Sequence, residues 1–296
     1  MRIILSRKGF DSSAGGCPSP IFPDGRLFSL PIPDKTSPIV YSEIHYDDID
    51  VGQLVSQLTR DPKRAHHRAH LDPDLRKEAL NRQPGRRPLL GQTGSAQGHL
   101  NNQCIVAGDI FLFFGSFRPV EFMDDRWRFI HHEPPRHVIW GWLQIGEILK
   151  VDNLGESSLK WARYHPHFAY KSDSANTLYL ASNVLSIRGQ STKINGAGVF
   201  PHIRKDLLLT KPGSTKQTSW QLPHWFFPSD GISKLSFNPN VNRWSLAGNF
   251  CCLESASRGQ EFVIDATGLE QAEEWILALL GETNKSSRLR EFKQNM

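Results

Sequence analysis

The opening stretch of the chain, MRIILSRKGFDSSAGG, joins a predicted apolar strand to residue types that bind phosphate. The residues of interest among its charged, hydroxyl and glycine residues are Ser6, Arg7, Lys8, Asp11, Ser12, Ser13, Gly15 and Gly16. Backbone N–H groups of small residues can surround an anion, and basic side chains add positive charge. The G-x-x-x-x-G-K-[ST] order of a P-loop is absent. We therefore expect a nucleotide-binding loop of another kind, with Lys8 and Asp11 as candidate catalytic residues. The alternative is a turn with a surface salt bridge.

A second polar stretch, GQTGSAQGHLNNQ at residues 91–103, combines glycine and side-chain amides with one histidine. An amide offers a donor beside an acceptor, which suits it to bind the edge of a nucleobase. Gln92 and Gln97 are therefore candidate nucleotide-binding residues. His99 is a candidate catalytic residue, because an imidazole exchanges a proton near neutral pH. The alternative is an ordinary surface loop, and glycine-rich residues 85–98 predict a loop rather than a helix.

Two carboxylates and an arginine occur in LDPDLR at residues 71–76. Paired acids can do acid–base chemistry or bind a metal. However, Asp72 followed by Pro73 and Asp74 is also typical of the start of a helix, where such residues cap the backbone and complement the helix dipole. We expect a helix over residues 72–81 with Asp72 as its cap. Arg76 is then placed to contact a nucleotide.

His165 and His167 flank a proline, and on an extended backbone their side chains face the same side. Such a pair is half of a metal site. Other histidines, at positions 131, 132 and 137, are scattered, and the neighbouring sequence offers no acid or cysteine at a standard ligand spacing. We therefore expect the pair to stack on a base or to serve the fold. The sequence assigns no metal ligand, and it leaves any cofactor unknown.

The elements that would position these residues are mainly strands. Segments dense in Phe, Ile, Val and Trp, with glycine at bends, are typical of strands in a small barrel. They occur at residues 108–117, 137–151, 177–187, 197–200, 206–210 and 261–265. Trp140 and Trp142 alternate along one of them and share a face, which is either core or a surface for base stacking.

Helices and extended chain complete the predicted fold, which is of the α+β class. A helix is expected over residues 51–58, and a T-x-x-E capping box at Thr267 predicts another that stops at Gly281. The proline-rich residues 17–38 predict extended chain. We expect a single domain at 1–283, with a barrel-like region over about 101–265, and then a charged tail at 284–296.

Positive charge gathers in one segment. The formal net charge of the chain is +5, and residues 60–87 alone hold nine Lys or Arg against four Asp or Glu. A segment of this kind attracts a nucleic-acid backbone through counterion release. The alternative is a solvated surface segment.

Composition excludes several classes of protein. The 39% of apolar and 10% of aromatic residues exclude a disordered chain. Apolar runs are too short for a signal peptide or membrane helix, so we expect no membrane partner. The four cysteines fit no disulfide or zinc pattern, which favours a reducing, cytoplasmic compartment. The sequence also lacks the G-x-S-x-G of serine hydrolases and the G-x-G-x-x-G of Rossmann domains.

Several of these segments together resemble the nucleotide modification associated domain family, the third in that named series. The resemblance covers most of the chain and is carried by SRKGFDSSAGG, PSPI, PDG, LDPDLR, GDIFLFFG, HVIWGWLQIGEI and GQEFV. It implies association with systems that hypermodify or handle nucleic-acid bases, and it brings no established catalytic residue. The two long apolar segments are also similar to the β-barrel core of PUA-like domains, which include the EVE and ASCH groups. That superfamily binds RNA, modified DNA bases or nucleotides, and a few of its members are hydrolases.

These observations support two main hypotheses. The first is an enzyme or accessory factor that acts on a nucleobase or nucleotide, with a phosphate at the opening loop and the base near Arg76, Gln92 and His99. The second is a non-catalytic PUA-like reader that captures a modified base against Trp140, Trp142 or Phe114. A third is a protein-interaction module with a basic segment. The expected partners are nucleic acid or a nucleotide, together with other components of a base-modification system.

Overall fold

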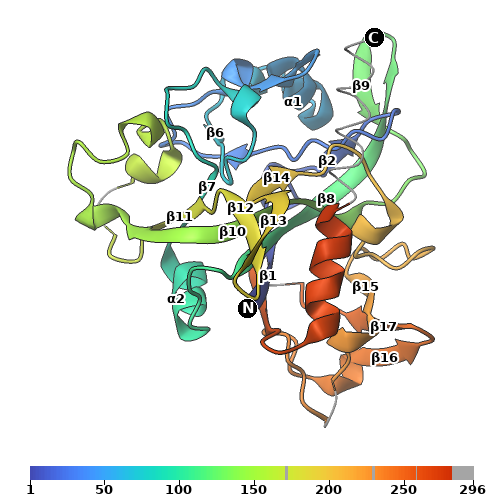
Figure 1. The fold of residues 1–296 in the computed structure, drawn as a ribbon. Coiled ribbons are helices and arrows are strands. Elements are labelled where there is room, and N and C mark those ends of the chain that lie inside the picture. The colour runs from blue at the N-terminus through green and yellow to red at the C-terminus, as the bar shows by residue number, and fades with distance from the viewer. Residues whose placement is uncertain (171–172, 229–230, 258, 282–296) are drawn as a thin grey trace, which may run out of the picture.

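Strands dominate the fold, which belongs to the mixed α+β class (Figure 1). The computed structural model describes residues 1–170, 173–228, 231–257 and 259–281 of the 296. Its largest sheet has nine strands, six of them in the order β18-β1-β8-β10-β11-β7. The strands of this path are β1 (Arg2–Arg7), β7 (Leu89–Gln92), β8 (Ile110–Met123), β10 (Arg136–Lys150), β11 (Thr177–Ala181) and β18 (Glu261–Asp265). Three further strands complete this sheet: β2 (Ser19–Ile21) and β9 (Arg126–Phe129) pair with β8, and β14 (Ala197–Val199) pairs with β10.

Smaller sheets and helices surround this sheet. The paired strands outside it are β3 (Ile32–Pro33) with β6 (Ala69–His70), β4 (His45–Tyr46) with β5 (Ile49–Asp50), β12 (Val184–Ile187) with β13 (Gln190–Asn195), and β17 (Phe250–Glu254) between β15 (Ser219–Pro223) and β16 (Trp244–Ala247). The helices are α1 (Val51–Thr59), α2 (Gly94–Asn102) and a last helix described over residues 270–281. In Figure 1 that last helix lies beside β15 and β17, and α1 and α2 lie on opposite sides of the large sheet.

The core forms where β8 and β10 cross the molecule. Both strands are buried along most of their length, as near-continuous apolar runs predict for strands covered on both faces. β1 pairs parallel with β8 and antiparallel with β18, so the first residues of the chain are central to the sheet. A second apolar cluster, which includes Phe10, Tyr41 and Leu54, packs α1 against the proline-rich segment. The opening loop is therefore anchored on both sides by core residues.

The large sheet is open rather than barrel-like in the described residues. Its outer strands β7 and β18 share no backbone pairing there, because Leu235 occupies the outer edge of β18 through a bridge to Ile264. The two edges meet instead through side chains, where Gln92 Nε2 donates to Glu261 Oε1 at 2.5 Å. The region expected to be barrel-like, at about 101–265, therefore contains strands whose sheet does not close into a barrel in the described residues, and the PUA-like core stays a prediction.

The strand predictions are confirmed at most positions. Segments 108–117, 137–151 and 261–265 correspond to β8, β10 and β18, and 197–200 corresponds to β14. Segment 177–187 divides into β11 and β12 at a turn. The strand expected at 206–210 is wrong, because a 3-10 turn over Lys205–Leu207 takes its place.

Two helix predictions need correction. Residues 72–81 contain only the 3-10 turn Lys77–Ala79, because the Asp72 carboxylate accepts the Gly91 N–H at 2.7 Å instead of capping a helix. Conversely, the loop predicted at 85–98 runs into helix α2, whose inner side buries Gln97 and Leu100.

The C-terminal region follows its prediction with a shifted start. The last helix begins at residue 270 rather than directly after Thr267, whose hydroxyl accepts a hydrogen bond from the N-terminal ammonium at 3.1 Å. The predicted charged tail at 284–296 lies outside the described residues. In the described part of the chain, no helix is both long enough and apolar enough to span a membrane.

Candidate functional site

The opening loop lines a cleft of about 690 Å³ just beyond the end of β1. The cleft is also lined by Asp34, by His70 and Asp72, by the end of β7, and by His167 with Tyr170. These residues are distant in sequence, and strand pairing joins them. β6, which ends at His70, pairs with β3, and β11, which follows the histidine turn, pairs with β7. The cleft therefore collects residues from six separate parts of the chain, the sixth being the stretch that includes Ser257 and Gln260.

The opening loop is a tight turn organised by Asp11. Its Oδ1 accepts hydrogen bonds from the Ser13 N–H at 2.8 Å, from the Ser13 hydroxyl at 2.7 Å and from the Ala14 N–H at 2.7 Å. Gly15 has a φ of +98°, and a Cβ there would lie 2.3 Å from the ring of buried Phe10. Asp11 thus uses one carboxylate oxygen to hold the loop in shape. Ser12 and Gly16 are exposed in the same turn.

Basic side chains stand at the base of this loop. Lys8 Nζ lies 3.4 Å from Glu261 Oε1, and both side chains are mostly buried. Burial raises the pKa of Glu261, and the charge of Lys8 opposes that rise. Arg7 donates to the carbonyl oxygens of Ser257 at 2.9 Å and Gly259 at 2.5 Å. Burial lowers the pKa of Arg7, against the charge of Asp11. This wall of the cleft therefore combines positive charge with a buried acid.

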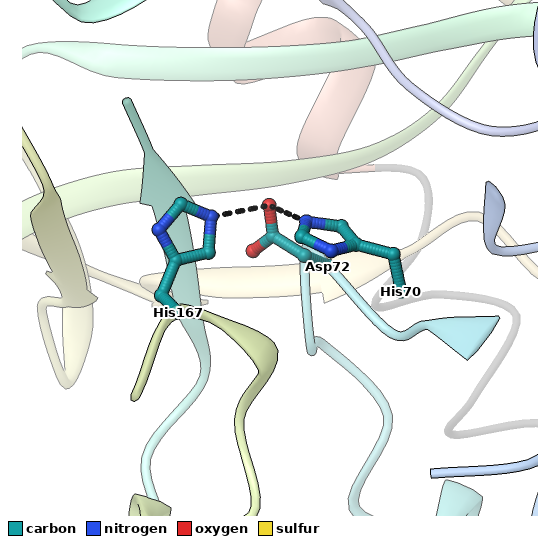
Figure 2. Close-up of side chains that lie close together, drawn as sticks. All are labelled: His70, Asp72 and His167. Carbon is teal, nitrogen blue, oxygen red and sulfur yellow. Dashed lines mark ion pairs between the residues drawn. The ribbon is translucent and has the colours of Figure 1, made fainter. Parts of the chain in front are cut away.

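Two histidines and an aspartate meet at another wall of the cleft, away from the opening loop in sequence (Figure 2). His70 Nε2 lies 3.6 Å from Asp72 Oδ2, and His167 Nε2 lies 3.9 Å from the same oxygen. Ligand atoms of the three residues all lie within 4.8 Å of one another, so this group could hold a metal ion. The three residues, His70, Asp72 and His167, are called the His–Asp–His cluster below.

Polar neighbours orient each member of the cluster. Asp34 Oδ2 accepts from His70 Nδ1 at 2.8 Å, and the Tyr170 hydroxyl lies 3.1 Å from that nitrogen. Asn176 Oδ1 lies 2.6 Å from His167 Nδ1. Asp72 Oδ1 accepts a hydrogen bond from the Gly91 N–H at 2.7 Å, and His165 Nε2 lies 3.2 Å from the same Asp72 oxygen. The His–Asp–His cluster is therefore preorganised by a second layer of side chains.

Burial and charge set the protonation of the cluster. Burial would raise the pKa of Asp72, but His165 and His70 outweigh it and hold that pKa well below its usual range. Burial would lower the pKa of His70, but Asp34 and Asp72 raise it above its usual value. For His167 burial prevails over the charge of Asp72, and its pKa falls to about 4. The wall thus holds ionised carboxylates against a neutral His167 at pH 7.

Gly91 allows the two sides of the cluster to meet. A Cβ at this position would lie 2.2 Å from the ring of His167, so only glycine permits the ring to pack on β7. Its N–H at the same time anchors Asp72. The glycine of the predicted polar stretch therefore serves close packing at the site.

The predicted site residues divide into two groups. Those that line the cleft are Arg7, Lys8, Asp11, Ser13, Gln92 and His167. His165 lies directly behind it, against Asp72. Ser12, Gly15 and Gly16 belong to the opening loop but do not line the cleft. The residues that the structure places elsewhere are Ser6, Arg76, Gln97, His99, Trp140 and Trp142. The opening loop and the HPH stretch, predicted independently of each other, are thus brought together.

The second group has other contacts. Arg76 lies 4.5 Å over the ring of Tyr46. Gln97 accepts from the Tyr179 hydroxyl at 3.0 Å inside the core. His99 lies on α2 with its Nε2 3.0 Å from Ser236 Oγ, and burial lowers the pKa of His99.

The two tryptophans and Ser6 lie in the large sheet. Trp142 is buried and donates its indole N–H to the Asn195 carbonyl at 3.0 Å. Trp140 is buried two positions earlier on β10, and Ser6 is buried opposite Glu261. The described structure therefore brings none of these three side chains to the cleft.

Sequence reasoning missed His70, Asp34, Tyr170 and Glu261 as site residues. His70 stands among basic residues and resembles part of a charged surface, and Glu261 lies within an apolar strand. One signal was present: His70 and Asp72 have the same i, i+2 spacing as His165 and His167. Two such pairs, each with a histidine, can supply opposite sides of one site.

Comparison with known proteins gives one match. The model of a family described as nucleotide modification associated domain 3 matches residues 2–265 of the chain. No curated protein and no protein of solved structure matches it.

Proposed function

Because the chain belongs to the nucleotide modification associated domain 3 family, we propose that it binds a nucleotide, free or within nucleic acid, in the cleft and acts on its base. The observation that carries this proposal is the convergence in one cleft of a basic, glycine-containing loop and the His–Asp–His cluster. A volume of about 690 Å³ also lies within the range of roughly 300–1,000 Å³ usual for small-molecule sites.

The loop wall is suited to a phosphate. Lys8 supplies a positive charge. The distance of 3.4 Å from its Nζ to Glu261 Oε1 is longer than in a close ion pair, so a bound anion can compete with Glu261 for the ammonium group. The Ser13 hydroxyl lines the same wall, and Asp11 holds the turn. We therefore assign the phosphate to Lys8 and Ser13, and to Asp11 a positioning role.

The wall formed by the His–Asp–His cluster is suited to the base. Neutral imidazoles and carboxylates can move protons or activate water next to a bound base. Tyr170 supplies an aromatic side chain at the same wall. Other components of a base-modification system are the expected partners.

The second hypothesis, a non-catalytic reader, relied on Trp140, Trp142 or Phe114 as a stacking wall. All three side chains are buried in the core, and none of them lines the cleft. We therefore favour the hypothesis of an enzyme. The hypothesis of a non-catalytic reader is one outcome of the test below.

The test is nucleoside mass spectrometry on DNA, RNA and free nucleotides from cells that express the protein, its Lys8→Ala variant or its Lys216→Ala variant. Lys216 is a matched control, since it is also a lysine paired with a glutamate, Glu254, but does not line the cleft. We expect a nucleoside of altered mass with the wild type and with Lys216→Ala only. Because Lys8→Ala leaves Glu261 buried without its cation, a Lys8→Met/Glu261→Gln double variant tests the same loss with the pair removed.

Binding is measured in parallel with purified protein and nucleoside 5′-monophosphates. Loss of Lys8 should weaken affinity about 10- to 100-fold, the effect of one charge-assisted hydrogen bond. Nucleotide binding without any mass change would replace the enzyme with the reader. If the protein neither binds a nucleotide nor changes the mass of any nucleoside, the proposed function is overturned.

A further inference from the structure

We propose that the His–Asp–His cluster binds a divalent transition-metal ion, Zn²⁺ or Fe²⁺, through His70 Nε2, His167 Nε2 and Asp72 Oδ2. This inference deepens the proposed function and rests on it for the nature of the substrate. It concerns the same cleft, and it adds an ion that the sequence did not indicate.

The separation of the ligand atoms fits a single ion. Two atoms bound to one zinc ion at about 2.1 Å, with a tetrahedral angle between them, lie about 3.4 Å apart. The two nitrogens lie 3.6 and 3.9 Å from Asp72 Oδ2. Figure 2 shows both rings turned toward this one oxygen, and the three ligand atoms lie within 4.8 Å of one another. Small side-chain movements would therefore complete the coordination.

The hydrogen-bond partners show which atoms of His167 carry protons. Asn176 Nδ2 donates to the His167 carbonyl at 2.8 Å, and this fixes the orientation of the amide. Its Oδ1 then faces His167 Nδ1 at 2.6 Å and can only accept a hydrogen bond, so Nδ1 carries the ring proton and donates it to that bond. In the neutral ring, Nε2 is therefore left with a lone pair, directed at the Asp72 carboxylate.

The same holds for His70. The Asp34 carboxylate accepts from its Nδ1 at 2.8 Å, so in the neutral ring Nε2 is an acceptor. Three acceptors, two imidazole nitrogens and Asp72 Oδ2, then converge without a donor between them. A cation at the point of convergence satisfies all three.

The other oxygen of Asp72 is already occupied. Its Oδ1 accepts the Gly91 N–H at 2.7 Å and lies 3.2 Å from His165 Nε2. His165 Nδ1 in turn accepts the His167 N–H at 3.4 Å, which places the ring proton on Nε2, toward Asp72. Metal-binding residues are commonly oriented by partners of this kind, a carboxylate or carbonyl on the second histidine nitrogen. The sequence thus supplies both the ligands and their supports.

Three protein ligands leave room for another. Structural zinc sites have four protein ligands, whereas catalytic sites have three and an open position. Two histidines and one carboxylate with open positions also suit Fe²⁺. His70, Asp72 and His167 all line the cleft, so the open position faces the space assigned to the nucleotide. When bound there, the ion would supply a Lewis acid at the wall of the cleft.

The test is metal analysis of the untagged protein, without nucleotide, after anaerobic incubation with Zn²⁺, Fe²⁺ or Co²⁺ and removal of unbound ion. We expect about one ion per chain, a visible absorption band for Co²⁺, and a rise of Tm on adding the metal. His70→Ala and His167→Ala should each lower metal affinity by more than tenfold. Asn176→Ala, which removes only an orienting group, should lower it about 10- to 100-fold.

His132→Ala is the matched control, because His131 and His132 form an exposed pair with ring nitrogens 3.3 Å apart, outside the cluster. It should leave the metal content unchanged. Two results would overturn the inference: the wild type binds no ion, or the wild type and all variants bind it equally. Either result would favour a protonated His70 between Asp34 and Asp72. Nucleotide binding measured on chelator-treated protein separates the two proposals, since either can fail while the other holds.

Discussion

At the scale of single residues, His137 lies in the core, away from the cleft. Its Nδ1 accepts the indole N–H of Trp220 at 2.9 Å, and the ring of Phe114 packs at a centroid distance of 5.2 Å. Burial lowers the pKa of His137 to about 3, the charge of Arg7 acts in the same direction, and Asp11 opposes it. The imidazole is therefore neutral in the folded protein at neutral pH.

This neutral histidine should make stability depend on pH. Its folded pKa lies below the usual value of about 6.5, so the unfolded chain binds a proton that the folded chain does not. The stability it confers is complete above pH 6.5 and is lost as the pH falls toward 3. Between pH 6.5 and 4.5 the free energy of unfolding should fall by about 2 kcal/mol through His137 alone.

Urea unfolding at pH 6.5, 5.5 and 4.5 measures this loss. His137→Gln is the comparison, because its side-chain carbonyl can still accept from Trp220 and does not titrate. The wild type should lose about 2 kcal/mol more than the variant over this range. Parallel losses in the two proteins would show that the pH dependence comes from other groups.

At the scale of elements, the segment from Asp74 to Leu89 is held by one buried acid. Asp74 is fully buried and accepts two hydrogen bonds from Arg82, at 2.7 and 2.8 Å, and one from Arg86 at 3.1 Å. Its N–H also donates to the Leu89 carbonyl at 2.9 Å, at the start of β7. Asp74 thus ties this segment to the strand that carries Gly91, the anchor of Asp72.

Removal of this acid should therefore be costly. Asp74→Ala leaves two arginines buried without their partner, and such a loss destabilises by about 3–5 kcal/mol. Glu121→Ala is the control, since Glu121 forms an exposed pair with Arg128 at 2.9 Å and should cost less than about 1 kcal/mol. Chemical denaturation of both variants gives the comparison. Losses of similar size would mean that the arginines find other partners or water.

The strands of the core could be predicted because their signal is local. β8 and β10 are almost wholly apolar, and such runs predict buried strands whatever their partners. Helix 72–81 was predicted wrongly for the opposite reason. Asp72 and Asp74 are good helix-capping residues locally, but both carboxylates are used by distant groups, Gly91 and Arg82. Tertiary hydrogen bonds thus overrode a local preference.

The cleft could be predicted on one side only. The opening loop is contiguous, so its residue types reveal a binding wall. The His–Asp–His cluster joins His70 and Asp72 to His167, and these residues meet only because β7 pairs with β11. A pairing of that range leaves no trace in the spacing of a single sequence. The orienting carboxylate of Asp34 is hidden for the same reason.

At the scale of the whole molecule, the positive excess is only partly available to a polyanion. In the basic segment 60–87, Arg82 and Arg86 are buried against Asp74, and Arg64 donates to the Gly15 carbonyl at 3.1 Å. These side chains serve the fold and the opening loop. The exposed basic residues of the segment are Arg60, Lys63, Arg68 and Lys77. Fewer charges than the composition indicates can therefore contact a nucleic-acid backbone.

If the substrate is a nucleotide within single-stranded nucleic acid, this surface should contribute a small salt dependence. Each neutralised phosphate changes the slope of log K against log salt by about 0.7 for single strands. Arg60→Ala/Lys63→Ala should therefore lower the slope by about 1.4 for a fluorescent single-stranded oligonucleotide, because both side chains are exposed beside α1. Lys211→Ala/Lys216→Ala removes the same charge from exposed positions elsewhere and should leave the slope unchanged. Equal changes in both variants would show that net charge alone attracts the strand. No change in either, with nucleoside monophosphates still bound, would identify the free nucleotide as the substrate.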